Sequence, residues 1–273
     1  MNELNLPGKV YFKTGSLPVA LRELTEIYGL KRALIVTDAG RHAYSAVTAV
    51  TRILERTGMR TAEYFDAGDP VTVDGLRGAL QKLQEFRPDA IVGVGESAAL
   101  YAAKVLRVCR MHPELDPADF DALQAAASKE AFAAAESAGN KALLVLVPTT
   151  FADGSQNTPF AKIVPDTFGR AASDNDAVTL RAFGFIPEIS ATDAQFALAM
   201  PADQVNADAA ELKSLCSKAL AGDGCNDYTE GLLSEAAGLV DRYVEEAAKG
   251  IPFALEKLMN AASIAGCAFG STL

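Results

Sequence analysis

The chain has 273 residues, of which 49% are hydrophobic, so it is long enough for one large domain or two modest ones with a substantial buried core. Its formal net charge is −10 with only 25 Lys and Arg, which argues against nucleic acid or an anionic lipid surface as a partner, because both require a basic surface. We therefore expect small molecules or other proteins as partners.

The cysteines and the first residues indicate a reduced protein that is not exported. None of the four cysteines forms a CxxC pair, so neither a disulfide framework nor a zinc ribbon is expected. The chain does not open with a basic region followed by an apolar core, and no run reaches the roughly 18 apolar residues that a membrane span requires. We expect a cytoplasmic protein with no membrane segment.

Up to about residue 148, apolar strands alternate with amphipathic helices, which is the pattern of a parallel sheet covered on both faces. The expected strands are residues 9–13, 32–37, 61–65, 90–94 and 142–147. The expected helices are residues 18–28, 44–56, 74–86 and 98–110. The sequence therefore predicts a doubly wound, mostly parallel α/β fold for this part of the chain.

The rest of the chain is mainly helical in its pattern. Residues 113–140 are Ala-rich and acidic, and either a helix under the sheet or a mobile excursion fits them. From Pro201 onward we expect three helices, which are residues 202–220, 227–249 and 252–269. The predicted organisation is a dinucleotide-binding α/β domain over residues 1–195 and an α-helical domain over residues 196–273.

Two strand ends carry residues suited to a dinucleotide. Asp38 follows strand 32–37, where its carboxylate can accept hydrogen bonds from the ribose hydroxyls of NAD; an Asp in an ordinary strand-end turn is the alternative. Strand 90–94 continues into a helix, whose first N–H groups would meet a diphosphate. Glu96 in that loop would repel the diphosphate, or it would stabilise the helix N-terminus through the helix dipole.

A third loop follows strand 142–147. Residues 148–163 read PTTFADGSQNTPFAKI, a polar Gly/Ser turn between an apolar strand and a second short strand. Dehydrogenase folds hold a dinucleotide with such turns, but a turn whose Ser and Thr side chains only satisfy local backbone groups has the same composition. The residues alone leave both interpretations open.

These segments resemble the iron-dependent (group III) alcohol dehydrogenase family. The loop IVGVGESAALYAAK at residues 91–104 is similar to the family's VGGGSxxDAAK. The segments GKVYFKTGSLPVAL, DYTEGL and EKLMNAASIAGCAF are similar to the alcohol dehydrogenase half of bifunctional aldehyde/alcohol dehydrogenases, so the resemblance covers nearly the whole chain. The third loop matches TTxGTGSExTPFAxI at six fixed positions, which are Thr149, Thr150, Gly154, Ser155, Thr158 and Pro159.

The resemblance implies an alcohol and aldehyde chemistry, a truncated all-α second domain, and NAD as the possible cofactor. It also shows departures from the family pattern: Tyr101 stands at the family's Asp, Gln156 at its Glu, and Ala152 and Asp153 at positions that the family keeps small or hydroxylated. The cofactor-binding residues that it implies are Asp38, Gly95, Glu96, Ser97, Thr149, Thr150, Gly154, Ser155 and Thr158.

In this family one Asp and three His hold a divalent iron or zinc, which polarises the alcohol oxygen for hydride transfer to the nicotinamide. The resemblance places the Asp at Glu211 and the first His at Leu215, and the chain reaches Leu273 before the segment that carries the other two. Its own two histidines, His42 and His112, are expected at the surface of the dinucleotide half. We therefore expect no iron or zinc and assign no catalytic residue.

The sequence fits three interpretations. In the first, the chain is an NAD-binding dehydrogenase homologue with lost or strongly reduced catalysis. In the second, it is a non-catalytic homologue used for assembly or regulation with a homo-oligomeric or protein partner, and in the third it is part of a longer product. Asp208 and Glu211 are expected to form a solvated helix face rather than a carboxylate pair. No GxSxG elbow, HExxH, P-loop or Cys/His dyad replaces the family chemistry.

Overall fold

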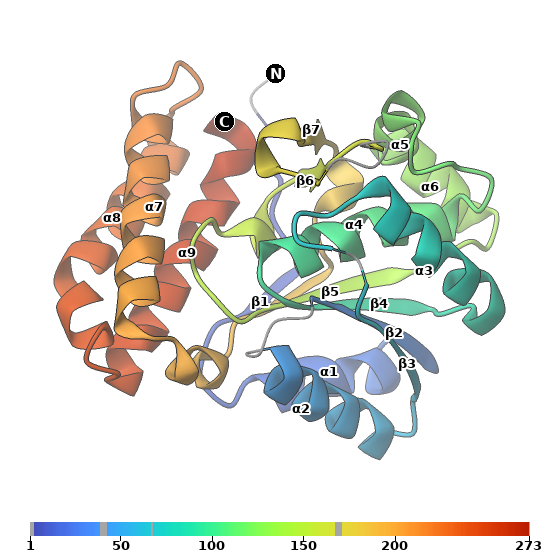
Figure 1. Cartoon of the computed structure of the whole chain (residues 1–273), viewed down its shortest axis with the longest axis horizontal. Helices are drawn as coiled ribbons and strands as arrows, with labels where there is room; N and C mark the ends of the chain where they lie inside the picture. The colour runs from blue at the N-terminus through green and yellow to red at the C-terminus, as the bar shows by residue number, and fades with distance from the viewer. Residues whose placement is uncertain (1–2, 39–42, 67, 167–170, 273) are drawn as a thin grey trace.

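Six parallel strands form one sheet in the order β1-β8-β5-β4-β2-β3 (Figure 1). The structure, a computed structural model, describes residues 3–38, 43–66, 68–166 and 171–272, so His42 lies outside the described residues. The strands are β1 (Lys9–Tyr11), β2 (Arg32–Thr37), β3 (Arg60–Tyr64), β4 (Ala90–Gly95), β5 (Leu143–Pro148) and β8 (Ile189–Ala191). The predicted parallel α/β sheet is thereby confirmed.

Helices cover both faces of this sheet, as the alternating pattern predicts. In β2, Ile35 packs toward one face, where α1 and α2 lie, and Leu34 packs toward the other, where α3 and α4 lie. The central strands are buried along their whole length, which explains their unbroken apolar runs. The helices are α1 (Leu17–Glu26), α2 (Ala43–Arg56), α3 (Val73–Phe86) and α4 (Ser97–Met111).

The Ala-rich segment 113–140 contains two short helices, α5 (Phe120–Ala126) and α6 (Lys129–Ser137). The helical alternative for this segment is therefore correct in type, although one continuous helix is not formed. Each helix has its own N-cap: Asp119 accepts a hydrogen bond from the Ala122 N–H, and Ser128 accepts one from the Ala131 N–H. These caps divide the segment into two helices.

A small antiparallel pair lies outside the main sheet. It consists of β6 (Phe160–Ile163), which is the short strand expected after the third loop, and β7 (Val178–Arg181). Strands β7 and β8 are too short to give a periodic signal, and the sequence did not predict them. The strand β1 was expected, but its pairing with β8 was not predicted, because that pairing joins residues far apart in the chain.

Three long helices complete the chain: α7 (Ala202–Leu220), α8 (Asp227–Ala247) and α9 (Pro252–Thr272). Asn226 and Thr229 form a reciprocal capping box at the start of α8. The apolar cluster of these helices includes Phe151 and Ala197 from the preceding part, so the helices and the α/β part share one buried region. The domain division at residues 195/196 stays a prediction. Within the described part of the chain, no helix is long and apolar enough to cross a membrane.

The connections place a crevice at the ends of β2 and β4. These strands are neighbours, but the helices that follow them, α2 and α4, lie on opposite faces of the sheet (Figure 1). Open α/β sheets bind ligands at the carboxyl ends of strands where the chain direction reverses in this way. The loops that begin at Asp38, Glu96 and Thr149 therefore form the candidate ligand site.

Candidate functional site

Backbone and side-chain hydrogen bonds join the three predicted cofactor loops. The Asp38 carboxylate accepts a hydrogen bond from the Glu96 N–H at 2.9 Å, and the Thr149 N–H donates to the Gly95 carbonyl at 2.9 Å. The Ser155 hydroxyl donates to the Ser97 hydroxyl at 3.3 Å. The structure therefore brings the loops after β2, β4 and β5 to one site, as their positions at strand ends predict.

Gly95 is required by this arrangement. Its φ is +146°, and a Cβ atom there would lie 2.3 Å from the Asp38 carboxylate. Asp38 is buried and seated against the Gly95 backbone, so its carboxylate ties the first loop to the second. Whether Asp38 also meets a ribose stays a prediction.

Glu96 occupies the N-cap position of α4 in an extended conformation, and its side chain makes no capping hydrogen bond. It lines a cavity of about 420 Å³ together with Ser97. A carboxylate therefore lies at the helix N-terminus, where the diphosphate of a dinucleotide would approach. Of the two interpretations of Glu96, the structure supports neither exclusively, because an interaction with the helix dipole requires no hydrogen bond.

The third loop is anchored to α9. Gly154 has φ +64°, and a Cβ atom there would lie 2.4 Å from the Ala262 carbonyl oxygen and 2.9 Å from the Gly266 backbone. The neighbouring Asn157, in the short helix η1 (Ser155–Asn157), donates to the Ser263 carbonyl at 2.8 Å and to its hydroxyl at 2.9 Å. This close contact between loop and helix was not predicted from the sequence.

A buried lysine holds the same loop from the other side. The Lys104 amine donates to the carbonyls of Ser155, Thr158 and Phe160 at 2.6, 2.8 and 2.8 Å, and lies 3.1 Å from the Thr158 hydroxyl. Burial lowers the pKa of Lys104 to about 7, and the Asp153 carboxylate opposes this shift. The predicted residues Ser155 and Thr158 thus act as acceptors for Lys104, whose contacts with this loop were not predicted from the sequence.

The two threonines that open the loop are both buried. Within the described residues, the Thr149 hydroxyl has no hydrogen-bond partner, while its N–H is held by Gly95. Thr150 follows it at the edge of the buried region. These two residues stay predicted cofactor contacts.

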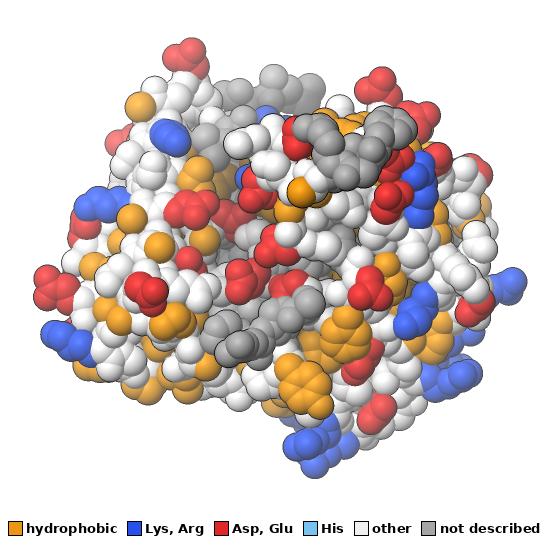
Figure 2. Space-filling model, viewed as in Figure 1, with side chains coloured by type: hydrophobic (Ala, Val, Ile, Leu, Met, Phe, Trp, Pro, Cys, Tyr) orange, Lys and Arg blue, Asp and Glu red, His pale blue; other side chains and the backbone are white. Residues whose placement is uncertain are grey.

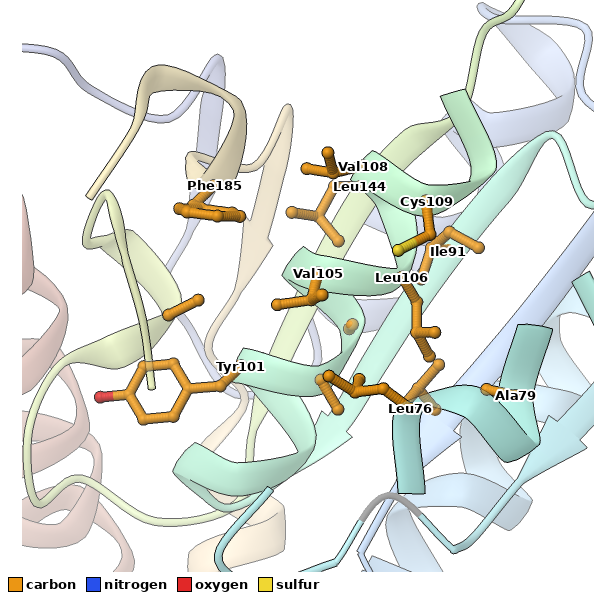
Figure 3. Close-up of a cluster of buried hydrophobic side chains, with 14 of the residues drawn as sticks. Leu76, Ala79, Ile91, Tyr101, Val105, Leu106, Val108, Cys109, Leu144 and Phe185 are labelled. Carbon is orange, nitrogen blue, oxygen red and sulfur yellow. The ribbon is translucent and has the colours of Figure 1, made fainter. Parts of the chain in front are cut away.

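Two residues that depart from the family pattern contact each other. The Tyr101 hydroxyl donates to the Asp153 carboxylate at 2.8 Å, and the other Asp153 oxygen accepts from the Ser155 N–H at 2.9 Å. Burial, reinforced by Asp153, raises the pKa of Tyr101 well above its usual value. Figure 3 shows the Tyr101 ring extending from α4, with its hydroxyl directed away from the apolar side chains of the cluster. The substitutions therefore form one connected unit.

The cavity beside this pair is acidic. Among its described lining residues, Lys162 is the one cation, and Figure 2 shows acidic side chains gathered around a hollow in this region of the surface. Burial and the neighbouring Asp174 and Asp38 raise the pKa of Asp69. The carboxylates that line the cavity are Asp69, Glu96, Asp153, Asp174 and Glu211.

The prediction of a solvated face at Asp208 and Glu211 is wrong for Asp208. Asp208 is only 9% exposed, because α7 packs this residue against the third loop, where the Phe151 backbone hydrogen-bonds to its carboxylate. Burial raises the pKa of Asp208 to about 7, and the charges of Glu96, Glu211 and Asp153 add to the rise. Burial and Asp153 also raise the pKa of Glu211.

The two positions predicted to replace metal ligands lie on α7. Glu211 lines the cavity, but Leu215 is half-buried against the apolar cluster of α7–α9 and has no donor atom. In the described parts of the chain, no three His, Cys, Asp or Glu side chains converge as a metal site requires. These residues do not fit a tightly held iron or zinc ion. His112 ends α4, near Glu114 at 3.6 Å, and lines no part of the cavity.

The six-stranded parallel sheet with helices on both faces defines a doubly wound α/β protein, with three loops meeting at the carboxyl ends of its strands. A family model for iron-containing alcohol dehydrogenase matches residues 7–180. The chain therefore belongs to the iron-containing alcohol dehydrogenase family, as the sequence resemblance implied.

Its relatives include larger proteins. The chain is 29% identical over 270 residues to the bifunctional aldehyde-alcohol dehydrogenase AdhE of Escherichia coli (strain K12), covering 97% of this chain and 29% of that protein. It is 28% identical to the aldehyde-alcohol dehydrogenase of Clostridium acetobutylicum, covering 96% and 30%. The chain thus spans about 30% of the length of these curated relatives.

Solved structures share the same fold. The iron-containing alcohol dehydrogenase of Thermotoga maritima aligns with a TM-score of 0.82 at 18% identity, covering 100% of this chain and 70% of that one. The sulfoacetaldehyde reductase of Bifidobacterium kashiwanohense, solved in complex with NAD+, aligns with a TM-score of 0.81 at 16% identity, covering 100% and 68%. Identities this low establish a common fold and nothing finer.

Proposed function

We propose that this chain is a member of the NAD-linked alcohol dehydrogenase family in which alcohol and aldehyde oxidoreduction is lost or strongly reduced. The observation that carries the proposal is Leu215, an apolar side chain at the position where the family resemblance calls for a histidine ligand. A leucine cannot share an electron pair with a metal ion, so α7 contributes at most the Glu211 carboxylate to a metal-binding set.

The acidic cavity supports a second part of the proposal, which is that NAD(H) binds weakly. A dinucleotide diphosphate would enter a space whose described lining has five carboxylates and one lysine. The negative carboxylates repel the negative diphosphate and so oppose its binding. Glu96 also places a negative charge at the N-terminus of α4, where the helix would otherwise stabilise a bound anion. The family loops supply the shape for a dinucleotide, while the charges disfavour it.

Two measurements on the same sample test this proposal. The first is NADH oxidation with acetaldehyde, without metal and with added iron(II) or zinc(II), for which we expect turnover at background. The second is a calorimetric titration with NADH and NADPH, for which we expect weak binding at most. Metal-dependent turnover above background would overturn the loss of catalysis, and tight NADH binding would overturn the role given to the carboxylates.

A second candidate function is assembly, with a second copy or another protein as partner. The observation that favours it is a group of exposed apolar side chains around the start of α9, which are Phe12, Leu198, Ile251 and Phe253. The segment of Phe12 meets α9 through the hydrogen bonds of Thr14 to Glu256, and the short helix Ala194–Ala199, which carries Leu198, also contacts α9. A monomer in light scattering at high protein concentration, with no partner recovered, would count against assembly. A cytoplasmic location belongs to both proposals, and the four cysteines are free thiols.

A further inference from the structure

A second cavity lies at the opposite edge of the sheet from the candidate cofactor loops. It has a volume of about 340 Å³ and is lined by the ends of α3 and α4, which pack against each other on one face of the sheet (Figure 1). Helix α3 ends shortly before β4 begins, and α4 runs back from the carboxyl end of that strand, so both helices end at the amino edge. The described lining residues are Leu80, Leu83, Gln84, Arg87, Cys109, Arg110, Pro113 and Asn140.

Half of this lining is apolar. Leu83 and Cys109 are nearly fully buried, and Leu80 is partly buried against the same core cluster. Burial raises the pKa of Cys109 to about 12, so its thiol is uncharged. Small-molecule sites combine an apolar surface of this kind with a few polar groups that fix orientation, and the volume lies at the lower end of their range. The cavity therefore suits a small ligand with an apolar body.

The polar part of the lining is basic. It contains Arg87 and Arg110, and no Asp or Glu is among the described lining residues. The Nε atom of Arg110 donates to the Pro88 carbonyl at 2.9 Å, while its terminal nitrogens have no partner among the described residues. Neither guanidinium forms an ion pair within the described part of the chain. Both therefore keep N–H donors for a ligand.

The positive charges at this edge act on one another. Burial and the charges of Arg32 and Arg87 lower the pKa of Arg110, and Asp89 opposes the shift. The Asp89 carboxylate already accepts hydrogen bonds from the backbone N–H groups of Lys31 and Arg32, at 3.0 and 2.8 Å. Three guanidinium groups thus lie close enough to repel one another in a chain of net charge −10. A bound anion would offset that repulsion.

The backbone of Arg87 is an independent indication. Arg87 follows α3 with φ +47° and ψ +61°, and among the described residues it is the one residue other than glycine with a positive φ. Glycine is favoured at such a helix end, because a Cβ atom there costs about 1 kcal/mol. A cation also interacts favourably with a helix C-terminus, but one in the last turn would do so without this cost. The side chain of Arg87 is therefore expected to do more than end the helix.

We propose that this cavity binds a small organic carboxylate with an apolar chain. The carboxylate pairs with the guanidinium groups of Arg87 and Arg110, whose paired N–H donors match its two oxygens, and the chain lies against Leu80 and Leu83. The ends of α3 and α4 present partial negative charge, which disfavours a doubly charged phosphate relative to a carboxylate. The inference does not rest on the proposed function, since none of these residues belongs to the cofactor loops. No covalent step is involved.

Calorimetric titration of the full chain with octanoate tests the proposal, at about 0.15 M salt so that diffuse attraction between charges is screened. We expect one site per chain for octanoate and much weaker binding of acetate, which lacks the chain, and of octanol, which lacks the charge. Absence of saturable octanoate binding would overturn the proposal. Octanol bound as tightly as octanoate would make the cavity a purely apolar site, and inorganic phosphate bound more tightly would make it a site for an inorganic anion; either result would overturn the carboxylate.

Matched variants locate the site. Arg110→Gln and Arg87→Asn each remove one guanidinium, so we expect about tenfold weaker binding of octanoate from each. Asn tolerates the left-handed backbone of position 87, and Arg87 is exposed, so this variant remains informative if Arg110→Gln folds poorly. Arg52→Gln is the control, because Arg52 is an exposed residue of α2, on the other face of the sheet. Equal effects of all three changes would place octanoate outside this cavity and overturn the proposal.

Discussion

The Tyr101 hydroxyl donates a hydrogen bond to the Asp153 carboxylate at 2.8 Å, and these are two of the positions at which the chain departs from its family's pattern. Tyr101 lies in α4 and Asp153 in the loop after β5, so a side-chain hydrogen bond joins a helix and a loop that the family resemblance places beside a dinucleotide. The substitutions act together: each provides the partner that the other requires in a buried setting.

Replacing Tyr101 by Phe should destabilise the protein. The change removes the hydroxyl donor and leaves one oxygen of a partly buried carboxylate without its partner, which costs about 2 kcal/mol for a hydrogen bond to a charged group. Urea unfolding followed by circular dichroism measures the loss. Tyr228→Phe is the matched control, because Tyr228 is 77% exposed and should change stability little. Equal effects of the two changes would show that the Tyr101–Asp153 bond contributes nothing.

The contact between the third loop and α9 predicts a large effect of Gly154→Ala. The added Cβ atom would lie 2.4 Å from the Ala262 carbonyl, so loop and helix must separate in addition to the backbone cost of positive φ. Gly29→Ala is the control, since Gly29 has φ +65° and nothing within 4 Å of the added atom. We expect about 1 kcal/mol for Gly29→Ala and about 3 kcal/mol or more for Gly154→Ala in unfolding free energy. Similar losses would argue that the close approach is readily relieved.

The sheet was predictable because its signals are local and long. Strand β4 and helix α4 lie next to each other in the chain, and the apolar run of the strand and the period of the helix are readable within about 15 residues. The third loop was also recognisable, because a polar turn such as that around Gly154 has a characteristic composition. These features depend on residues close together in the sequence.

The site's interior was not predictable for the opposite reason. The contact of Gly154 with Gly266 and the burial of Asp208 join residues on separate helices and loops, and no local pattern reports such packing. The sequence predicts a solvated Asp208 because acidic side chains on helices are usually exposed. A lysine such as Lys104 within an otherwise apolar helical face was a readable signal, since a buried amine must find oxygen partners.

The raised pKa of Asp208 predicts a dependence of stability on pH. Its folded-state pKa is about 7 against an ordinary value of 3.8, so the folded protein binds more protons than the unfolded one between these values. Stability therefore falls as pH rises from about 4 to about 7. Asp208→Asn should raise the melting temperature at about pH 8 and leave it nearly unchanged at about pH 4, with a gain of about 1 to 2 kcal/mol after solvent screening is allowed for.

The control for this pH dependence is Asp203→Asn, which removes the same charge from an exposed position of α7. It should leave the difference between the two pH values as it is in the unaltered protein. A gain from Asp208→Asn that is equally large at acid pH would show that packing, and not ionisation, causes the effect. Melting curves recorded by differential scanning calorimetry across this pH range distinguish the two causes.

Glu96→Gln should strengthen NADH binding. The side chain lies at the N-terminus of α4 and lines the cavity, so neutralising it removes a charge that opposes the diphosphate while it retains nearly the same volume. The expected gain is about tenfold in affinity, which corresponds to about 1.4 kcal/mol. Glu130→Gln is the control, because Glu130 is an exposed residue in the first turn of α6 and lines no part of the cavity. If Glu96→Gln and Glu130→Gln leave the affinity equally unchanged, the charge of Glu96 is not what limits the dinucleotide, and the shape set by Tyr101 and Asp153 becomes the cause to test.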